Sequence, residues 1–195
     1  AQLNDGYLML MLDLQDKEKL LVELVQIGID LHGLLKVGAA WGGYGGGHGV
    51  GRKWPILFAG LMLDDPEMKA VGITYGPERF QEDCQTFRVT QLDHDRYPAV
   101  FPVLGAVAWG ERHCTNPARD DQARGYVYCC TINASHGAAI CARIMGATKL
   151  WNHAPFFDYV DFHMTETAQL WGANDSRRSW TVFAREMWDT HRKDF

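Results

Sequence analysis

The stretch KEKLLVELVQIGIDLHGLLKVGAAWGGYGGGHGVGRKWPILFAGLML, residues 17–63, carries the strongest helix signals of the chain. Its first part carries leucine and isoleucine at the 3.6-residue period of a helix, at Leu20, Leu24, Ile27, Leu31 and Leu34. Because this period places them on one face, it predicts an amphipathic helix over about residues 17–36. The last part, 56–63, is apolar on every face, which predicts a buried helix with Pro55 in its first turn.

A glycine-rich loop joins these two helices. Eight of the chain's 20 glycines lie between Gly38 and Gly51. Glycine is unfavourable in regular elements, so this density indicates a sharp turn or a close approach of the backbone to something else. The loop matches neither a Walker A motif nor a G-x-G-x-x-G fingerprint. It leads into a helix N-terminus, where free N–H groups favour an anion, and it therefore predicts a ligand-binding loop, with a structural crossover as the alternative.

Four side chains of the loop are candidates for chemistry. Arg52 can bind a carboxylate or sulfate in bidentate fashion, and Lys53 adds a point charge. Tyr44 and His48 are able to exchange protons. The loop is therefore expected to contribute both anion binding and acid–base groups.

The chain contains seven tryptophans, two of which flank the loop. Trp41 and Trp54 offer large, rigid aromatic faces of the kind that stack on sugar rings. Packing between helices is the alternative for each of them. Both are candidate substrate-binding residues.

A second cluster lies in the segment Tyr126–Gly137. A helix is expected over about residues 131–145, ended by Gly146 as the C′ residue. Asn133 and His136 would share one face of this helix, with Tyr126 just before it. His136 is a candidate catalytic residue and Asn133 and Tyr126 are candidate substrate-binding residues, with a satisfied core histidine as the alternative.

The acidic residues give weaker signals. Asp158 and Asp161 lie three apart, hence on one helix face, where paired carboxylates can do acid–base work; capping or ion pairing is the alternative. The run Asp93-His94-Asp95 is interpreted as a solvated turn, because ligands so close in sequence rarely converge on one ion. We therefore expect no metal site and no cofactor.

The remaining elements complete the fold prediction. Short helices are expected over Leu3–Leu12, from Asp64–Glu67 onward, over Pro155–Met164, and after a cap near Asn174–Ser176. Residues 72–127 are broken by X-Pro and Gly-Pro steps, with short strands expected around Thr86–Gln91. The predicted class is mainly α, with antiparallel helical hairpins and a long irregular region in the middle. Residues 1–195 are expected to form a single mostly helical domain.

Composition narrows the function classes. The formal net charge of −5 and the pI of about 5.9 argue against a nucleic-acid partner, which would call for a basic face. No apolar run approaches the roughly 20 residues that span a bilayer, and no signal peptide is visible. The five cysteines are odd in number and contain no C-x-x-C pair, so buried structural cysteine is the expectation.

Four segments, QIGID (26–30), GRKWPILFAG (51–60), CCT (129–131) and ATKLWNH (147–153), carry a resemblance. Together they resemble the helical (α/α) toroid domain of bacterial carbohydrate-active enzymes, which include polysaccharide lyases and six-hairpin glycosidases. A complete toroid has more helices than this chain. The resemblance therefore implies a part of a larger toroid, a smaller helical array, or two copies that complete a site in a homo-oligomer.

The resemblance implies an enzyme that acts on an acidic, uronate-containing polysaccharide or oligosaccharide and is secreted or periplasmic. A lyase needs a base for the proton alpha to the uronate carboxylate and a group that neutralises that carboxylate. Tyr44, His48 or His136 would be the base, and Arg52 or Asn133 would hold the carboxylate.

Two alternatives accompany the lyase. A glycoside hydrolase of the six-hairpin type needs two carboxyl groups across the scissile bond. The available acids are Glu82, Asp83, Asp158 and Asp161. A non-catalytic glycan-binding or structural domain would use Trp41, Trp54 and the basic loop only to bind, or would use the loop only as a hinge.

Overall fold

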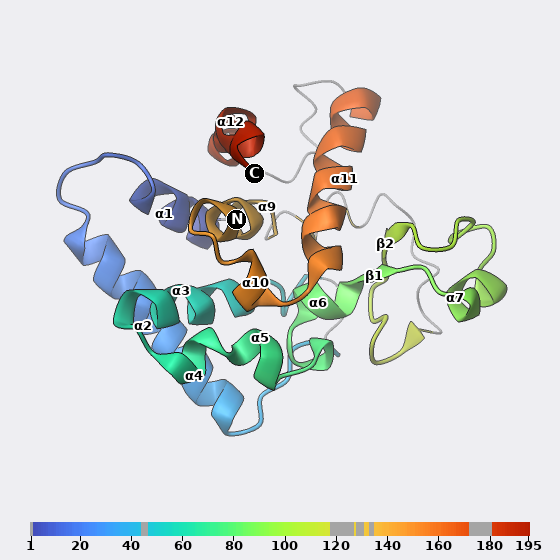
Figure 1. Cartoon of the computed structure of the whole chain (residues 1–195), viewed down its shortest axis with the longest axis horizontal. Helices are drawn as coiled ribbons and strands as arrows, with labels where there is room; N and C mark the ends of the chain where they lie inside the picture. The colour runs from blue at the N-terminus through green and yellow to red at the C-terminus, as the bar shows by residue number, and fades with distance from the viewer. Residues whose placement is uncertain (1, 44–46, 118–126, 128–130, 133–134, 172–180) are drawn as a thin grey trace.

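The structure is a computed structural model that describes residues 2–43, 47–117, 127, 131–132, 135–171 and 181–195. The described part is mainly helical, with one small two-stranded sheet (Figure 1). This confirms the predicted mainly α class.

The helices α2 (Glu18–Lys36) and α3 (Lys53–Leu63) are the two helices that residues 17–63 predict, and they pack against each other. Gly28 makes their close packing possible, because a Cβ atom there would lie 2.2 Å from the Pro55 carbonyl oxygen and 2.5 Å from the Ala59 Cβ. Residues 53–60 of α3 are all buried, whereas Leu61 is half-buried and Met62 and Leu63 are exposed, so the prediction of burial from the apolar run 56–63 holds for 56–60. Burial of this helix contributes much of the hydrophobic stabilisation of the fold.

A second group of helices packs around α9 (His136–Ile144), which contacts α1 (Gln2–Leu10), α11 (Ala154–Trp171) and α12 (Val182–His191). In α9 all residues from 136 to 142 are buried. The helix begins five residues later than predicted, and Gly146, with φ +65°, follows its last turn as predicted. Tyr7 of α1 packs edge-on against Trp54 and Phe58, which joins the two groups of helices in one core.

Short elements connect the long helices. They are α4 (Pro66–Lys69), α5 (Val71–Thr74), η1 (Pro77–Arg79), α6 (Gln81–Gln85), α7 (Gln91–Arg96), α10 (Thr148–Trp151) and η4 (Arg192–Asp194). Asp65 caps α4 by accepting a hydrogen bond from the Met68 N–H at 2.9 Å, as expected for the Asp64–Glu67 segment. The cap of α12 is Thr181, so the predicted cap near Asn174–Ser176 is wrong for the described helix; those three residues lie outside the described part.

The irregular middle of the chain forms a small projection around two strands. The strand β1 (Thr86–Arg88) pairs antiparallel with β2 (Val107–Trp109), and Phe87, Val89 and Phe101 form a separate apolar cluster beside them. Asp93 is buried and forms a capping box with Thr90 at the start of α7, which corrects the interpretation of that run as a solvated turn.

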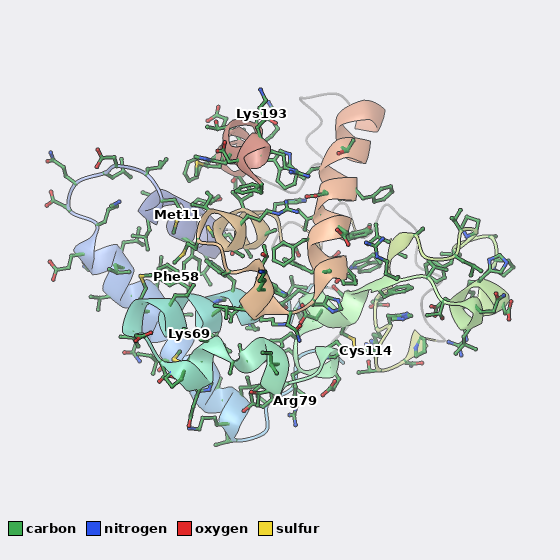
Figure 2. The ribbon with its side chains drawn as sticks, in the orientation of Figure 1. Met11, Phe58, Lys69, Arg79, Cys114 and Lys193 are labelled. Carbon is green, nitrogen blue, oxygen red and sulfur yellow. A yellow bond between two sulfur atoms is a disulfide. The ribbon has the colours of Figure 1, made fainter. Side chains whose placement is uncertain are left out.

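A disulfide between Cys84 and Cys114 ties α6 to the segment that follows β2 (Figure 2). The expectation of buried structural cysteines holds for Cys141, which is a free thiol in the core, but it did not include this bond. Cys129 and Cys130 lie outside the described residues. Among the described residues, no helix is long and apolar enough to cross a membrane.

Candidate functional site

The N-terminus of α3 is already occupied by a carboxyl group of the protein itself. Glu82 of α6 accepts hydrogen bonds from the backbone N–H groups of Gly51 (3.1 Å), Arg52 (3.1 Å) and Lys53 (2.8 Å). The sequence predicts that these N–H groups bind an external anion. The glycine loop is therefore fastened onto α6 here, which favours its structural alternative over the ligand cradle.

Next to Glu82 lies a buried ion pair. The Lys53 ammonium pairs with Asp83 Oδ2, and both side chains are almost fully buried. The ammonium also lies 5.2 Å from the ring centroid of Phe80 and 5.6 Å from that of Trp151. Burial, and then the neighbouring Asp83 carboxylate, raise the pKa of Glu82, whereas the backbone N–H groups oppose that shift.

These contacts correct the substrate-binding assignments of three loop residues. Lys53 has its charge neutralised inside the protein. Trp54 is fully buried in the core, and Trp41 is nearly so, packed on Phe80. A buried ring offers no face to a sugar, so all three contribute to packing in this structure.

The three residues that the lyase interpretation would combine are not in one environment. His48 is exposed and Arg52 half-buried, with the Arg52 guanidinium 3.4 Å from the His48 carbonyl oxygen. His136 is fully buried at the start of α9, and its Nε2 lies 3.0 Å from Nδ1 of His163 on α11. Burial, and then His163, hold the pKa of His136 well below its ordinary value. His136 is thus a neutral core histidine, which corrects its assignment as a catalytic base.

The other candidates lie outside the described residues. They are Tyr44, Tyr126 and Asn133.

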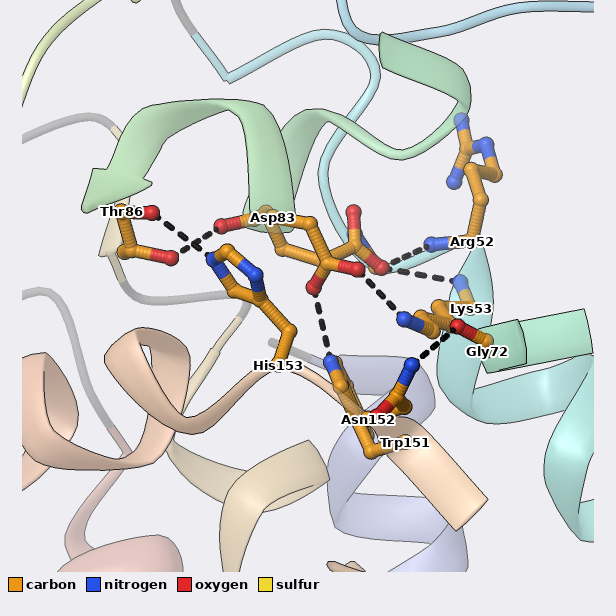
Figure 3. A network of polar contacts seen from close by, with 10 residues as sticks. Arg52, Lys53, Gly72, Asp83, Thr86, Trp151, Asn152 and His153 are labelled. Carbon is orange, nitrogen blue, oxygen red and sulfur yellow. Dashed lines mark hydrogen bonds and ion pairs between the residues drawn. The ribbon is translucent and has the colours of Figure 1, made fainter. Parts of the chain in front are cut away.

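A second segment, residues 151–153 at the end of α10 and just before α11, lies next to the buried ion pair. Each of its three side chains makes a hydrogen bond to another part of the chain (Figure 3). Trp151 Nε1–H donates to Asp83 Oδ1 at 2.7 Å. Asn152 Nδ2–H donates to the Gly72 carbonyl at 3.0 Å, and His153 Nε2 lies 2.8 Å from the Thr86 carbonyl oxygen.

The backbone of this segment is also tightly constrained. Asn152 has φ +56°, a left-handed conformation that asparagine tolerates better than most residues. A Cβ atom at Gly72 would lie 2.2 Å from the Leu150 carbonyl oxygen, so only glycine allows α5 to approach so closely. The three hydrogen bonds and the close contact with Gly72 hold residues 151–153 in a fixed conformation, as a preorganised site requires.

An open pocket of about 560 Å³ lies over this segment. It is lined by Arg143, Thr148, Lys149, Asn152, His153, Ala154, Phe157 and Asp158. Its volume falls within the roughly 300–1,000 Å³ of small-molecule sites. The lining combines polar and charged groups from α9, α10 and α11 with one buried aromatic ring.

His153 is the acid–base group of this pocket. A carbonyl oxygen can only accept, so in the neutral ring the bond to Thr86 keeps the hydrogen on Nε2 and leaves the lone pair on Nδ1. Among the described residues Nδ1 has no hydrogen-bond partner. The side chain is therefore fixed in the tautomer that can accept a proton at Nδ1.

The two acidic residues predicted as a possible pair lie near the pocket but are already ion-paired. Asp158 pairs with Arg88, while Asp161 accepts from Arg143 at 2.6 Å and from Arg192 at 2.9 Å. This arrangement matches the ion-pairing alternative for both residues.

The sequence did not predict this pocket, although the segment ATKLWNH (147–153) is one of the four that carry the resemblance to a toroid domain. The available signal was an asparagine and a histidine immediately before the alanine–proline start of a helix. What gives them significance is the anchoring by Asp83, Gly72 and Thr86, which come from about 70–80 residues earlier in the chain.

Comparison of the chain with protein-family models, with curated proteins and with solved structures gave no match.

Proposed function

We propose that this protein is a polysaccharide lyase that cleaves an acidic, uronate-containing glycan by β-elimination at the pocket over residues 151–153. The proposal is carried by the position of His153. Its Nε2 is hydrogen-bonded to the Thr86 carbonyl, which leaves Nδ1 as a base beside the cationic residues that line the pocket. A lyase requires this combination of a positioned base and positive charge near a carboxylate.

In the proposed reaction Nδ1 of His153 takes the proton from the carbon alpha to the uronate carboxylate. The electron pair left on that carbon forms a C=C bond as the bond from the β carbon to the glycosidic oxygen breaks. That oxygen departs with its electron pair and takes a proton from water, and the proton held on Nδ1 of His153 is then released to water. The product carries an unsaturated uronate at its new end.

The number of carboxyl groups that line the pocket favours a lyase over a glycoside hydrolase. A hydrolase needs two carboxyl groups flanking the bond. Among the described lining residues the only carboxylate is Asp158, and it is engaged by Arg88.

The helical hairpins are consistent with part of an (α/α) toroid, which further domains of the same chain or a second copy would complete. A secreted or periplasmic location is supported by the Cys84–Cys114 disulfide, because such bonds persist in oxidising compartments.

The test is an assay for the absorbance of unsaturated uronate on a panel of polyuronates, with His153→Gln as the variant. The glutamine amide can still donate to the Thr86 carbonyl but provides no basic nitrogen. We expect a loss of about 10²–10⁴-fold in rate, the range of a general base. His94→Gln, at another half-buried histidine with a ring nitrogen 2.9 Å from a backbone carbonyl oxygen, that of Phe101, is the matched control and should keep its activity.

Full activity of His153→Gln would show that another group is the base. Absence of the unsaturated product with every polyuronate tested would refute the lyase itself.

A further inference from the structure

The surroundings of the pocket are positively charged on an otherwise acidic protein. The charged lining residues, together with the two ion-pair networks to which Arg143 and Asp158 belong, comprise four cations and two carboxylates, an excess of two positive charges on a chain whose formal net charge is −5. The cations are Arg88, Arg143, Lys149 and Arg192, and the carboxylates are Asp158 and Asp161. Such a local excess attracts an anionic ligand.

Three of the four cations are committed to the protein. Arg143 and Arg192 both bind Asp161, and Arg88 binds Asp158. The Arg143 guanidinium also lies 5.4 Å from the ring centroid of Phe157, which further holds it in place. Of these arginines, Arg143 lines the pocket itself.

Lys149 is different. It is exposed, it lines the pocket, and among the described residues its ammonium has no carboxylate or hydrogen-bond partner. Lys149 and Asn152 are three residues apart at α10 and its C-cap, and Thr148 precedes them in the lining. The N-terminus of the 18-residue helix α11 begins at Ala154, also in the lining, and adds a partial positive charge.

We propose that Lys149, with the Thr148 hydroxyl as second donor, forms a subsite for the carboxylate of a single uronate residue. The choice of a carboxylate over another anion rests on the proposed function, since β-elimination requires the carboxylate to be neutralised. The ammonium and the hydroxyl bind the two carboxylate oxygens, and this places the sugar in the pocket that also contains His153. Recognition by this subsite is separable from catalysis, because it does not use Nδ1 of His153.

The experiment measures binding of free glucuronate to the whole protein by calorimetry, with glucose and glucose 6-sulfate as comparison ligands. We expect glucuronate to bind and glucose not to bind. Lys149→Gln should weaken glucuronate binding by about 10- to 100-fold, the range expected for a hydrogen bond to a charged group. Thr148→Val, which keeps the shape of the side chain, should weaken it less. Lys19→Gln, at an exposed lysine of α2, is the matched control and should bind like the unmodified protein.

Unchanged glucuronate binding by Lys149→Gln, or no glucuronate binding at all, would overturn the subsite. Equal binding of glucose 6-sulfate would overturn its assignment to a carboxylate. If polyuronates are cleaved while Lys149→Gln binds normally, the subsite fails and the lyase stands. If glucuronate binds through Lys149 but no polyuronate is cleaved, the subsite stands and the lyase fails.

Discussion

Two tryptophans of the core allow the buried polar network to be measured by substitution. Trp54 and Trp151 are both fully buried and both pack against other aromatic rings. The indole N–H of Trp151 donates to the Asp83 carboxylate at 2.7 Å. The indole N–H of Trp54 has no acceptor among the described residues. Replacing each by phenylalanine therefore removes similar apolar volume, but only the substitution at Trp151 removes a hydrogen bond.

The expected difference follows from the two N–H groups. Trp151→Phe loses a hydrogen bond to a charged group, which costs about 1.5–3 kcal/mol of the free energy of unfolding. Trp54→Phe removes a buried donor without an acceptor, which relieves a penalty of about 1–3 kcal/mol. The cost of the smaller ring is common to both. We therefore expect Trp151→Phe to be less stable than Trp54→Phe by roughly 3 kcal/mol or more, adding the two effects.

Urea unfolding followed by far-UV circular dichroism measures this difference, provided that the m-values of the two variants agree. For a chain of this size it corresponds to roughly 6–12 °C in the midpoint of thermal unfolding. Equal stabilities, or a less stable Trp54→Phe variant, would refute the argument that Asp83 holds Trp151 by a buried charge-assisted hydrogen bond.

Two further predictions concern stability. Because the pKa of His136 in the folded protein lies well below its ordinary value of 6.5, the unfolded chain binds a proton that the folded chain excludes; the free energy of unfolding should fall as pH drops below about 6.5, by up to about 1.4 kcal/mol per pH unit. Urea titrations between pH 7 and pH 5 check this, and a slope no steeper than that of a His136→Gln variant would contradict it. Replacing Cys84 and Cys114 together by alanine should lower the free energy of unfolding by about 3–4 kcal/mol, since the bond closes a loop of 30 residues. A double variant as stable as the oxidised protein would show that the loop is held without the bond.

The helices were the most predictable part of the fold. Apolar periodicity located α2, and the unbroken apolar run located α3, because both signals arise within one segment. Gly146 at the end of α9 was predictable for the same reason, since a left-handed residue after a helix is a local requirement. The cap of α12 at Thr181 was not predicted, because several capping residues compete in the sequence and only packing decides among them.

The candidate site was predicted poorly, and the glycine loop shows why. Its composition matched a ligand cradle, and the free N–H groups at the start of α3 were correctly located. The sequence did not reveal that Glu82, about 30 residues later, would accept those hydrogen bonds. Likewise His136 resembled a catalytic residue until its burial against His163 was known.

The sequence alone predicts a mainly helical chain and locates a long amphipathic helix and a mostly buried helix within it. Those features depend on side-chain periodicity and backbone preference, which act over a few residues. The tertiary structure, in contrast, shows which charged groups are paired inside the protein and which are left to bind a ligand. Asp83 binds Lys53 and Trp151, whereas Lys149 keeps a charge that no described residue neutralises. The energy of a buried charge depends on partners far away in the chain, so neither residue type nor spacing can supply that information.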